Sequence, residues 1–434
     1  MSDDIPRPAR LSLHSRRRLF LQGMGALAVA RGPLAHGAST RAVTVAAFEA
    51  GPTSALIWVR GPGQMRTRID FGADASLTQA RPGPAVALER GSDYITTTRL
   101  DGLAPGQTWY YRAVDPATNA PVSATGRFKT APAGPQPFTF AFSGDMHEDY
   151  KPFRLFDVIG AQDPDFFLML GDTVYADQPR KQFSPSVSHY RRKHATIRQD
   201  EPLQRFLAQH ATYAIWDDHE IEDGAHGGHP NIGEALQVFK EYWPVEPVTS
   251  DALYRRFAWA GIDFFMLDTR RFRSPQTAAD GPDKTMLGAA QKQWLFESLK
   301  ASAAPFRFII TSGPFHGGGP DSWGGYRTER DEIVRFIREQ KLRGIVFLTA
   351  DYHLARDWTN PGTRLREYMV GPIAQFTHYQ KQPAARDRYE KSGTFNYGDG
   401  FNFGRFRVDP AAEQARLEFV GADGKTLFSA DLKP

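Results

Sequence analysis

Hydrophobic and polar positions follow two different patterns along the chain, and the pattern changes near residue 132. In residues 41–132, short apolar runs with a period of two, such as Ala55–Val59 and Thr67–Phe71, are separated by turns rich in glycine and proline. A period of two places one face of a strand on a core and the opposite face in solvent. We therefore expect a small β-sandwich over residues 41–132.

The segment 103–112 supports this prediction. It reads Leu-Ala-Pro-Gly-Gln-Thr-Trp-Tyr-Tyr-Arg, which resembles the corner before a late strand in immunoglobulin-like and fibronectin-like sandwiches. Residues 131–137 then form a stretch rich in proline and glycine, a composition typical of a domain boundary.

Beyond residue 137, apolar strands alternate with stretches in which apolar residues recur every three or four positions. That alternation predicts a layered α/β domain over residues 137–434, with both sheet faces covered. Strands are expected at 138–142, 166–170, 213–216, 262–267, 306–311 and 344–349. Helices are expected at 153–160, 233–242, 289–301 and 329–340. Short strands near the C-terminus are expected at 406–408, 415–420 and 426–430, the last two as a hairpin.

Composition and charge exclude several classes of protein. Apolar residues make up 41% of the chain and charged residues 24%, as in folded globular proteins. Because the chain has no long uncharged apolar run, we expect no transmembrane anchor. Six arginines and two aspartates precede residue 38, so this segment alone accounts for the formal net charge of +4. Because the remainder is neutral, we expect no nucleic acid as a stable partner.

The arginine cluster at 16–18 is followed by a weakly apolar stretch rich in glycine and alanine. Residues 1–37 thus resemble a twin-arginine export signal, which predicts the twin-arginine export machinery as a partner and a periplasmic or secreted location. The alternative is a disordered basic N-terminus. The chain has no cysteine, so a metal site in it would use only nitrogen and oxygen ligands.

Four of the six predicted strands end in groups that bind metal ions. These groups are Ser143-Gly-Asp145-Met-His147, Gly171-Asp172-Thr-Val-Tyr175, Asp217-Asp218-His219-Glu220 and Ala350-Asp351-Tyr-His353. In layered α/β folds, ligands bind outside the carboxyl ends of the strands, where distant segments converge. A single Gly-Asp after a strand is usually a turn or a helix cap. Four coinciding groups favour a metal site.

Two neighbouring cations need a carboxylate that they share. Asp172 is the natural bridge. Asp145 and His147 can face one ion together with His353, and Tyr175 can add a phenolate oxygen. Asp218 and Asp351 then remain for the second ion.

Further motifs resemble the alkaline phosphatase D (PhoD-like) group of the calcineurin-like metallophosphoesterases. They are Trp216-Asp-Asp-His-Glu220, Leu267-Asp-Thr-Arg270 with Arg273-Ser274, Thr285-Met-Leu-Gly288 with Gln293-Trp-Leu295, and Asp321-Ser-Trp323. The resemblance implies a sandwich of two sheets flanked by helices (α-β-β-α), preceded by a fibronectin-like domain. The superfamily's separate histidine has no match near Thr311-Ser312.

The resemblance also implies an activity. It is metal-dependent hydrolysis of small-molecule phosphate esters, as an alkaline phosphatase or phosphodiesterase, by a metal-bound hydroxide at a binuclear centre. The two ions would be divalent or trivalent (Ca, Fe, Zn or Mn). Asp145, His147, Asp172, Tyr175 and His353 would bind one ion, and Asp172, Asp218 and Asp351 the other. His219 would protonate the leaving group, supported by Asp217 or Glu220.

Three further residues are candidates for contact with substrate. Arg270 and Arg271 can fork onto phosphate oxygens, although arginines on loops are usually solvated. His316 lies in a glycine-rich loop that can approach a ligand. A phospholipase D-like phosphodiesterase is one alternative function. A secreted binding or adhesion protein with a degenerate catalytic fold is another, from a different class.

Overall fold

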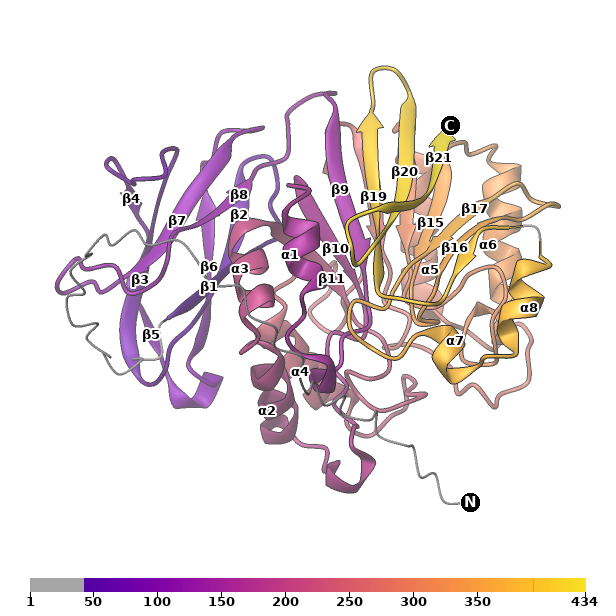
Figure 1. Ribbon diagram of the computed structural model, residues 1–434, viewed down its shortest axis with the longest axis horizontal. Helices are drawn as coiled ribbons and strands as arrows, with labels where there is room; N and C mark the ends of the chain where they lie inside the picture. The colour runs from indigo at the N-terminus through magenta and orange to yellow at the C-terminus, as the bar shows by residue number, and fades with distance from the viewer. Residues whose placement is uncertain (1–42, 393) are drawn as a thin grey trace, which may run out of the picture. The chain divides into compact units, whose positions relative to one another are not determined.

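Figure 1 shows two β-sheets that face each other. The apolar core between them is rich in phenylalanine. The computed structural model describes residues 43–392 and 394–434. In this core, Phe140 stacks on Phe166 of its own sheet with ring centroids 5.2 Å apart. Its ring also meets Phe264 and Phe308 of the opposite sheet edge-on, both at 5.2 Å. Offset and edge-on aromatic pairs of this kind stabilise a core beyond the area that they bury.

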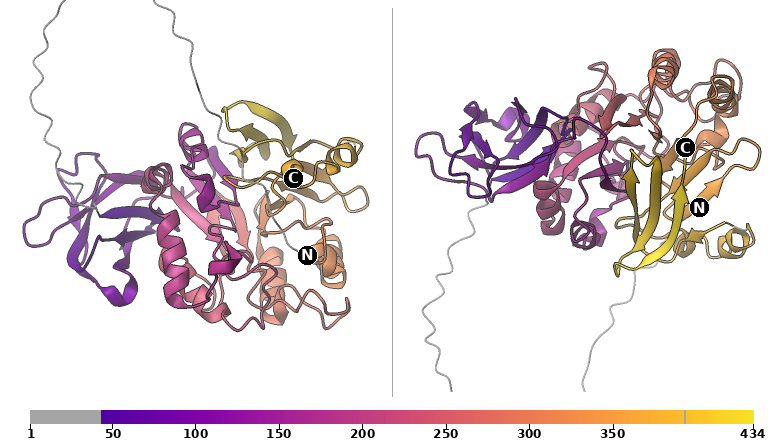
Figure 2. Two further views of the ribbon diagram at one scale, coloured as in Figure 1. Left: turned by 60° about the horizontal axis from the view of Figure 1, so that its bottom comes forward. Right: turned by 90° about the horizontal axis from the view of Figure 1, so that it is seen from above.

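The strands of the larger sheet, in spatial order, are β21 (Thr426–Leu432), β20 (Gln414–Gly421), β19 (Asn402–Asp409), β9 (Phe138–Ser143), β10 (Phe166–Leu170), β11 (Ala211–Ile215), β1 (Thr44–Phe48), β2 (Ser54–Arg60) and β6 (Ile95–Asp101). β9, β10 and β11 are parallel, so their carboxyl ends lie at one edge. Figure 2 shows the C-terminal strands β19, β20 and β21 extending this sheet beyond β9.

The second sheet has the order β12 (Arg255–Trp259), β13 (Ile262–Met266), β14 (Arg307–Ile310), β15 (Ile345–Thr349), β17 (Arg366–Met369), β16 (Ala355–Thr359) and β18 (Asn396–Tyr397). The run from β13 through β14 and β15 to β17 is parallel. β13, β14 and β15 are buried along their whole length, as expected for parallel strands that are covered on both faces.

Helices cover the outer face of each sheet. The helices are α1 (Leu155–Gly160), α2 (Val187–Ile197), α3 (Glu201–Gln209), α4 (Ile232–Tyr242), α5 (Gly288–Ala301), α6 (Arg327–Glu339), α7 (His378–Lys381) and α8 (Ala385–Glu390). Short 3-10 turns lie at Arg90–Ser92, Glu148–Tyr150, Arg180–Gln182 and Trp323–Gly325. Apolar residues of α1, α3 and α4 share a core with the larger sheet, and those of α5 and α6 share one with the second sheet. The expected α-β-β-α layering is therefore confirmed.

The N-terminal strands build a sandwich that uses part of the larger sheet. Its other sheet consists of β3 (Met65–Gly72), β4 (Arg81–Pro82), β5 (Val86–Leu88), β7 (Thr108–Val114) and β8 (Gly126–Lys129). β1 pairs in parallel with β11 through Phe48 and Thr212. A separate apolar cluster lies between β1 and β2 on one side and β3, β7 and β8 on the other. The described residues all fall within one compact unit.

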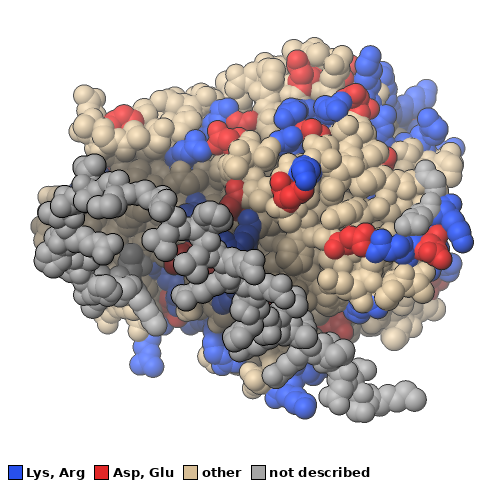
Figure 3. Space-filling model, in the orientation of Figure 1, with Lys and Arg blue, Asp and Glu red and all other residues tan. Residues whose placement is uncertain are grey.

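Two expectations from the sequence concern export and charge. The predicted export signal, residues 1–37, lies outside the described residues. Among the residues that are described, no helix is both long enough and apolar enough to cross a bilayer. Basic and acidic side chains are interspersed on the face seen in Figure 3.

Candidate metal centre

Four loops that follow the carboxyl ends of strands carry the acidic residues of the site. Asp145 comes two residues after β9, and Asp172 two residues after β10. Asp218 follows β11, and Asp351 follows β15 of the opposite sheet. The site is therefore assembled from both sheets, at the edge where ligands bind in layered α/β folds.

Asp145, Asp172 and His353 form one group of potential ligands. One ligand atom from each lies within 4.8 Å of the other two. His353 Nε2 is 3.8 Å from Asp145 Oδ1 and 3.2 Å from the hydroxyl of Tyr175. Two carboxylates, an imidazole and a phenol oxygen are suitable ligands for a divalent or trivalent cation.

Asp172 also belongs to a second group, with Asp218 and His219, whose ligand atoms again lie within 4.8 Å of one another. One carboxylate is thus common to both groups. This sharing is the arrangement that two neighbouring cations require.

The carboxylates of the site favour the binding of a cation. Asp145 Oδ2 and Asp172 Oδ1 are buried and have no hydrogen-bond partner among the residues that the structure describes. Burial raises the pKa of Asp145 and of Asp172 well above the usual range, and burial also raises that of Asp351. Buried carboxylate oxygens without partners are costly unless a cation binds them. These Asp and His groups are therefore placed to bind metal ions.

The backbone at the site is strained. Asp145, Asp172, Asp351 and His353 all adopt left-handed conformations, with φ between 49° and 71°. Such conformations are unfavourable for residues with a side chain and cluster at functional sites. Gly371 shows how closely the backbone approaches the site, because a Cβ there would lie 2.3 Å from Asp145 Oδ2.

His219 is oriented by a residue that the sequence analysis did not single out. Its Nδ1 donates to Asp177 Oδ1 at 2.8 Å, and the Asp177 side chain is fully buried. Burial opposes the charged form of His219, but the carboxylates of Asp172, Asp218 and Asp177 raise its pKa well above the usual value. Asp177 lies in the same loop as Asp172 and Tyr175, which was the one signal available from sequence.

Asp217 and Glu220 were expected to support His219, and their described hydrogen bonds go to other groups. Asp217 Oδ1 accepts from Arg270 Nε at 2.5 Å and from the Ser312 hydroxyl at 2.7 Å. Glu220 accepts from the amide and hydroxyl of Thr173, at 2.5 and 2.7 Å. These two carboxylates connect the acidic motif to neighbouring loops.

Arg270 is a buried ion-pair partner. Besides Asp217, its guanidinium binds Asp321 at 3.0 Å and lies 3.7 Å from Asp218. Burial alone would raise the pKa of Asp218, but the positive charges of Arg270 and His219 hold this pKa below its usual range. Arg271 instead donates to the backbone oxygen of Asp251 at 2.9 Å.

Three other predicted residues occupy different places. The ring of His147 lies 5.0 Å from that of Tyr175, beside the first group of ligands. Asp351 is partly buried, in the loop after β15. His316 is buried, and it pairs through Nδ1 with Glu367 at 3.0 Å.

Comparisons with known proteins agree with this geometry. A family model described as PhoD-like phosphatase matches residues 138–419. A second model, of the N-terminal domain of PhoD-like phosphatases, matches residues 30–132. Alkaline phosphatase D of Bacillus subtilis (strain 168) is 28% identical over a region that covers 58% of this chain and 52% of the relative. The chain thus spans about half the length of that curated relative.

Two solved structures share the fold. A structure of PhoD superposes with a TM-score of 0.77 at 21% identity, and the matched region covers 90% of this chain and 88% of the PhoD chain. A purple acid phosphatase from yellow lupin (Lupinus luteus) seeds superposes with a TM-score of 0.62 at 13% identity, and the matched region covers 90% of this chain and 74% of the lupin chain. At these identities the similarity shows the arrangement of the sheets and helices.

Proposed function

Because the chain belongs to the PhoD-like phosphatase family, we propose that it is a metal-dependent hydrolase of phosphate esters. The observation that carries this proposal is the position of Asp172, which has a carboxylate oxygen within 4.8 Å of ligand atoms of Asp145 and His353 and also within 4.8 Å of a carboxylate oxygen of Asp218. The substrate is a small phosphate ester, either a monoester or a diester.

The cluster holds two cations in this proposal. Asp145, His147, Asp172, Tyr175 and His353 would bind one ion, and Asp172, Asp218 and Asp351 the other. When bound, the ions supply positive charge that offsets the negative charge of the phosphate group. The buried oxygens of Asp145 and Asp172 that lack partners support this assignment.

His219 donates a proton to the leaving group. With Nδ1 held by Asp177, its other ring nitrogen, Nε2, is free to donate to a departing alkoxide. Proton donation of this kind typically contributes about 10²–10⁴-fold to the rate. Asp217 and Glu220 contribute indirectly, because they fix the loop on which His219 lies.

The proposal also includes domain organisation and location. Residues 41–132 form an N-terminal sandwich domain and residues 137–434 the catalytic domain, which is supported by two family models that meet between residues 132 and 138. Export to the periplasm or the medium by the twin-arginine machinery rests on the arginine cluster at 16–18.

The test is a two-substrate assay on the metal-loaded protein. Release of nitrophenol from p-nitrophenyl phosphate and bis(p-nitrophenyl) phosphate is measured at alkaline pH, with and without chelator, beside elemental analysis. We expect hydrolysis of at least one ester, lost on chelation. His219→Ala should keep its metal and lose about 10²–10⁴-fold in kcat.

His226→Ala, a histidine replacement in the loop that follows the acidic motif, serves as the control and should retain activity. Loss of metal in His219→Ala would make that histidine a ligand. Activity on neither ester, with no bound metal, would support the alternative of a secreted binding protein with a degenerate catalytic fold.

A further inference from the structure

Three partly exposed aromatic side chains border the candidate metal centre, and we call them the aromatic rim. They are Tyr150 of the turn Glu148–Tyr150, Phe376 of the loop after β17, and Phe401, which directly precedes β19. Among the described residues only two large apolar side chains are fully exposed, and Tyr150, at 37%, is one of them. A single exposed apolar residue needs no explanation, whereas several that gather beside a site indicate a surface for a ligand.

Tyr150 packs against one of the candidate metal ligands. Its ring meets that of His147 edge-on, with the ring centroids 6.2 Å apart, and the ring of Phe401 lies 6.1 Å from that of Tyr150. The ring of Tyr175 lies 5.0 Å from that of His147 and 4.2 Å from that of His219. A row of rings in contact therefore runs from the proposed proton donor to the exposed part of the rim.

Phe376 packs against a second candidate ligand. The centroid of its ring lies 4.6 Å from that of His353, with the two rings edge-on. The ammonium group of Lys381 lies 4.7 Å from the same centroid, in a cation–π contact. These contacts fix the position of the Phe376 ring beside the metal centre.

Backbone hydrogen bonds hold the three segments of the rim together. The amide of His147 donates to the backbone oxygen of Ala374 at 2.8 Å, which joins the first segment to the second. The amide of Asn402 donates to the backbone oxygen of Pro372 at 3.3 Å, which joins the third segment to the second. The rim is therefore a preformed surface, as small-molecule sites usually are.

The metal centre is open to solvent beside the rim. The side chains of His147 and His219 are 12% and 18% exposed, whereas that of Asp145 is only 1% exposed. A ligand that approaches the centre therefore passes His147 and His219. Tyr150 contacts the first of these two residues and so lies at the entrance.

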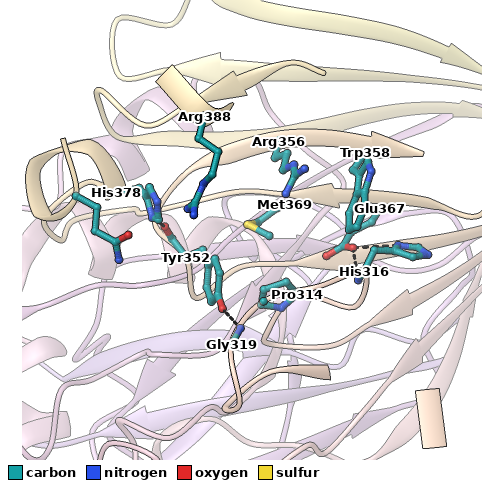
Figure 4. Close-up of a pocket in the computed structure, with 12 residues that line it drawn as sticks. Pro314, His316, Gly319, Tyr352, Arg356, Trp358, Glu367, Met369, His378 and Arg388 are labelled. Atoms are coloured by element: carbon teal, nitrogen blue, oxygen red, sulfur yellow. Dashed lines mark hydrogen bonds and ion pairs between the residues drawn. The ribbon is translucent and has the colours of Figure 1, made fainter. Parts of the chain in front are cut away.

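A separate cavity of about 380 Å³ borders the loop that carries Asp351 and His353 (Figure 4). Tyr352 lines it, and the Tyr352 hydroxyl accepts a hydrogen bond from the amide of Gly319 at 2.6 Å. No candidate metal ligand is among the described residues that line this cavity. The rim, in contrast, contacts two of these ligands directly. The organic part of an ester bound at the metal centre therefore meets the rim.

We propose that the aromatic rim binds the organic group of the ester while the phosphate lies at the metal centre, and that this group is aromatic. Aromatic rings prefer offset and edge-on contacts with one another, and the rim offers several ring surfaces for such contacts. The inference rests on the proposed function, since it names the substrate class of the same site.

Phosphonates test the substrate class without hydrolysis, because their C–P bond is not an ester. Binding of phenylphosphonate, cyclohexylphosphonate and methylphosphonate to the full-length, metal-loaded protein is measured by calorimetry at alkaline pH, where all three are dianions. We expect phenylphosphonate to bind about tenfold more tightly than methylphosphonate, since tenfold is the gain from an aromatic contact of ordinary strength. Cyclohexylphosphonate, which has a similar size but no π-system, should bind with an affinity between the two.

Tyr150→Ala and Phe376→Ala should each bring the ratio of the phenylphosphonate and methylphosphonate affinities towards one. Tyr150→Phe, which keeps the ring, should preserve the wild-type ratio. Tyr110→Ala is the matched control and should also preserve it, because Tyr110 is a partly exposed tyrosine on β7 of the N-terminal sandwich. Thermal melting and elemental analysis establish that each variant is folded and loaded with metal, and two separate positions guard against the loss of one variant.

Kinetics provide a second measurement of the same contact. Tyr150→Ala should raise KM for p-nitrophenyl phosphate by about tenfold and change kcat by less than about twofold. This split is expected when an interaction is lost equally from the bound substrate and from the transition state.

Equal affinities of the wild-type protein for phenylphosphonate and methylphosphonate would overturn this inference. So would alanine variants that lose affinity for both probes by the same factor, because the rings would then only support the histidines that they contact. Equal binding of phenylphosphonate and cyclohexylphosphonate would overturn the aromatic class of substrate.

Hydrolysis of p-nitrophenyl phosphate by the wild-type preparation tests the proposed function separately. A protein that hydrolyses this ester without preferring phenylphosphonate retains the function and loses the inference. One that has the preference but no hydrolysis keeps the aromatic binding surface and loses the function.

Discussion

The Nδ1 of His219 donates to Oδ1 of Asp177, a carboxylate that is fully buried, over 2.8 Å. The second oxygen of Asp177 accepts from the amide of Asp223 at 3.3 Å. Asp177 is thus held in place from the loop that carries the acidic motif, and it fixes both the ring orientation and the proton position of His219. Such a partner behind a reactive histidine determines which ring nitrogen can act.

Asp177→Asn tests this relationship. The amide keeps the shape of the carboxylate but loses its charge and can present a donor to Nδ1, so His219 can adopt the wrong tautomer. We expect kcat for p-nitrophenyl phosphate to fall by about 10–100-fold, as is typical when such an orienting partner is changed. Metal content and KM should stay close to those of the wild type. A variant with unchanged kcat would show that Asp177 has no part in the reaction.

Metal removal should affect stability as well as activity. The Asp145 and Asp172 oxygens that lack partners are stabilised by any bound cation, and binding to the folded state alone adds about 2.7 kcal/mol when the ligand is at 100 times its Kd. We therefore expect chelation to lower the melting temperature and to abolish ester hydrolysis. Asp172→Asn, which changes the carboxylate common to both ligand groups, should bind less metal and lose the response to chelator.

Asp357→Asn is the control for that experiment, because this residue lies on β16 and outside both ligand groups. It should keep the full shift in melting temperature on chelation. An Asp172→Asn protein that retained the metal content of the wild type would argue against a shared ligand.

Local signals account for what the sequence predicted correctly. The six central strands and four of the helices are continuous apolar or periodic segments, and the structure has them within a few residues of the expected bounds. The acidic groups were found because each directly follows such a strand. Parallel strands bring their carboxyl ends to a common edge, so convergence follows from topology alone.

Elements with a mixed surface escaped prediction. Helix α2 buries His189, Tyr190 and His194 among its charged residues, so its buried face does not read as apolar. Strand β16, Ala355–Thr359, contains little apolar sequence because most of it is only partly buried. Periodicity detects apolar faces, and these two elements are held by aromatic and polar contacts.

The roles of single side chains could not be predicted, since they depend on how separate loops meet. Arg270 and Arg271 are adjacent in sequence, yet one is 1% exposed among carboxylates and the other binds a backbone oxygen at the surface. Likewise, the partner of His219 comes from the loop after β10 and not from its own acidic motif. The spacing of residues along the chain does not predict such contacts.

The buried position of Arg270 leads to a prediction on stability. Its guanidinium compensates Asp217, Asp218 and Asp321, and removing one partner of a buried ion pair leaves charges uncompensated. Arg270→Gln should therefore reduce the free energy of unfolding by about 3–5 kcal/mol. Arg271→Gln, the adjacent control, should change it by less than about 0.5 kcal/mol. Urea unfolding at neutral pH measures both.

A different outcome would support the contact with substrate for which the sequence makes Arg270 a candidate. If Arg270→Gln were as stable as the wild type and only its KM for phosphate esters rose, Arg270 would bind substrate phosphate.

The last prediction concerns acid stability and a histidine away from the candidate metal centre. His194 is buried, with its ring 5.1 Å from that of Tyr242, and burial lowers its pKa to about 3. In the unfolded chain an ordinary histidine takes up a proton near pH 6.5. Between pH 6.5 and about 3 the unfolded state therefore binds a proton that the folded state excludes, and the folded state is destabilised as pH falls through this window. Above pH 6.5 neither state is charged, so the residue contributes nothing.

His194→Phe removes this titration and keeps an aromatic ring against Tyr242. Relative to the wild type, the variant should gain stability as pH falls from 8 to 4.5, by roughly 2–3 kcal/mol at pH 4.5. Any constant packing cost of the substitution cancels when the two pH values are compared. Melting temperatures at both values, for both proteins, provide the measurement. If the difference between variant and wild type were the same at pH 8 and pH 4.5, His194 would take up its proton at the same pH in the folded and the unfolded protein, which its burial against Phe239 and Tyr242 argues against.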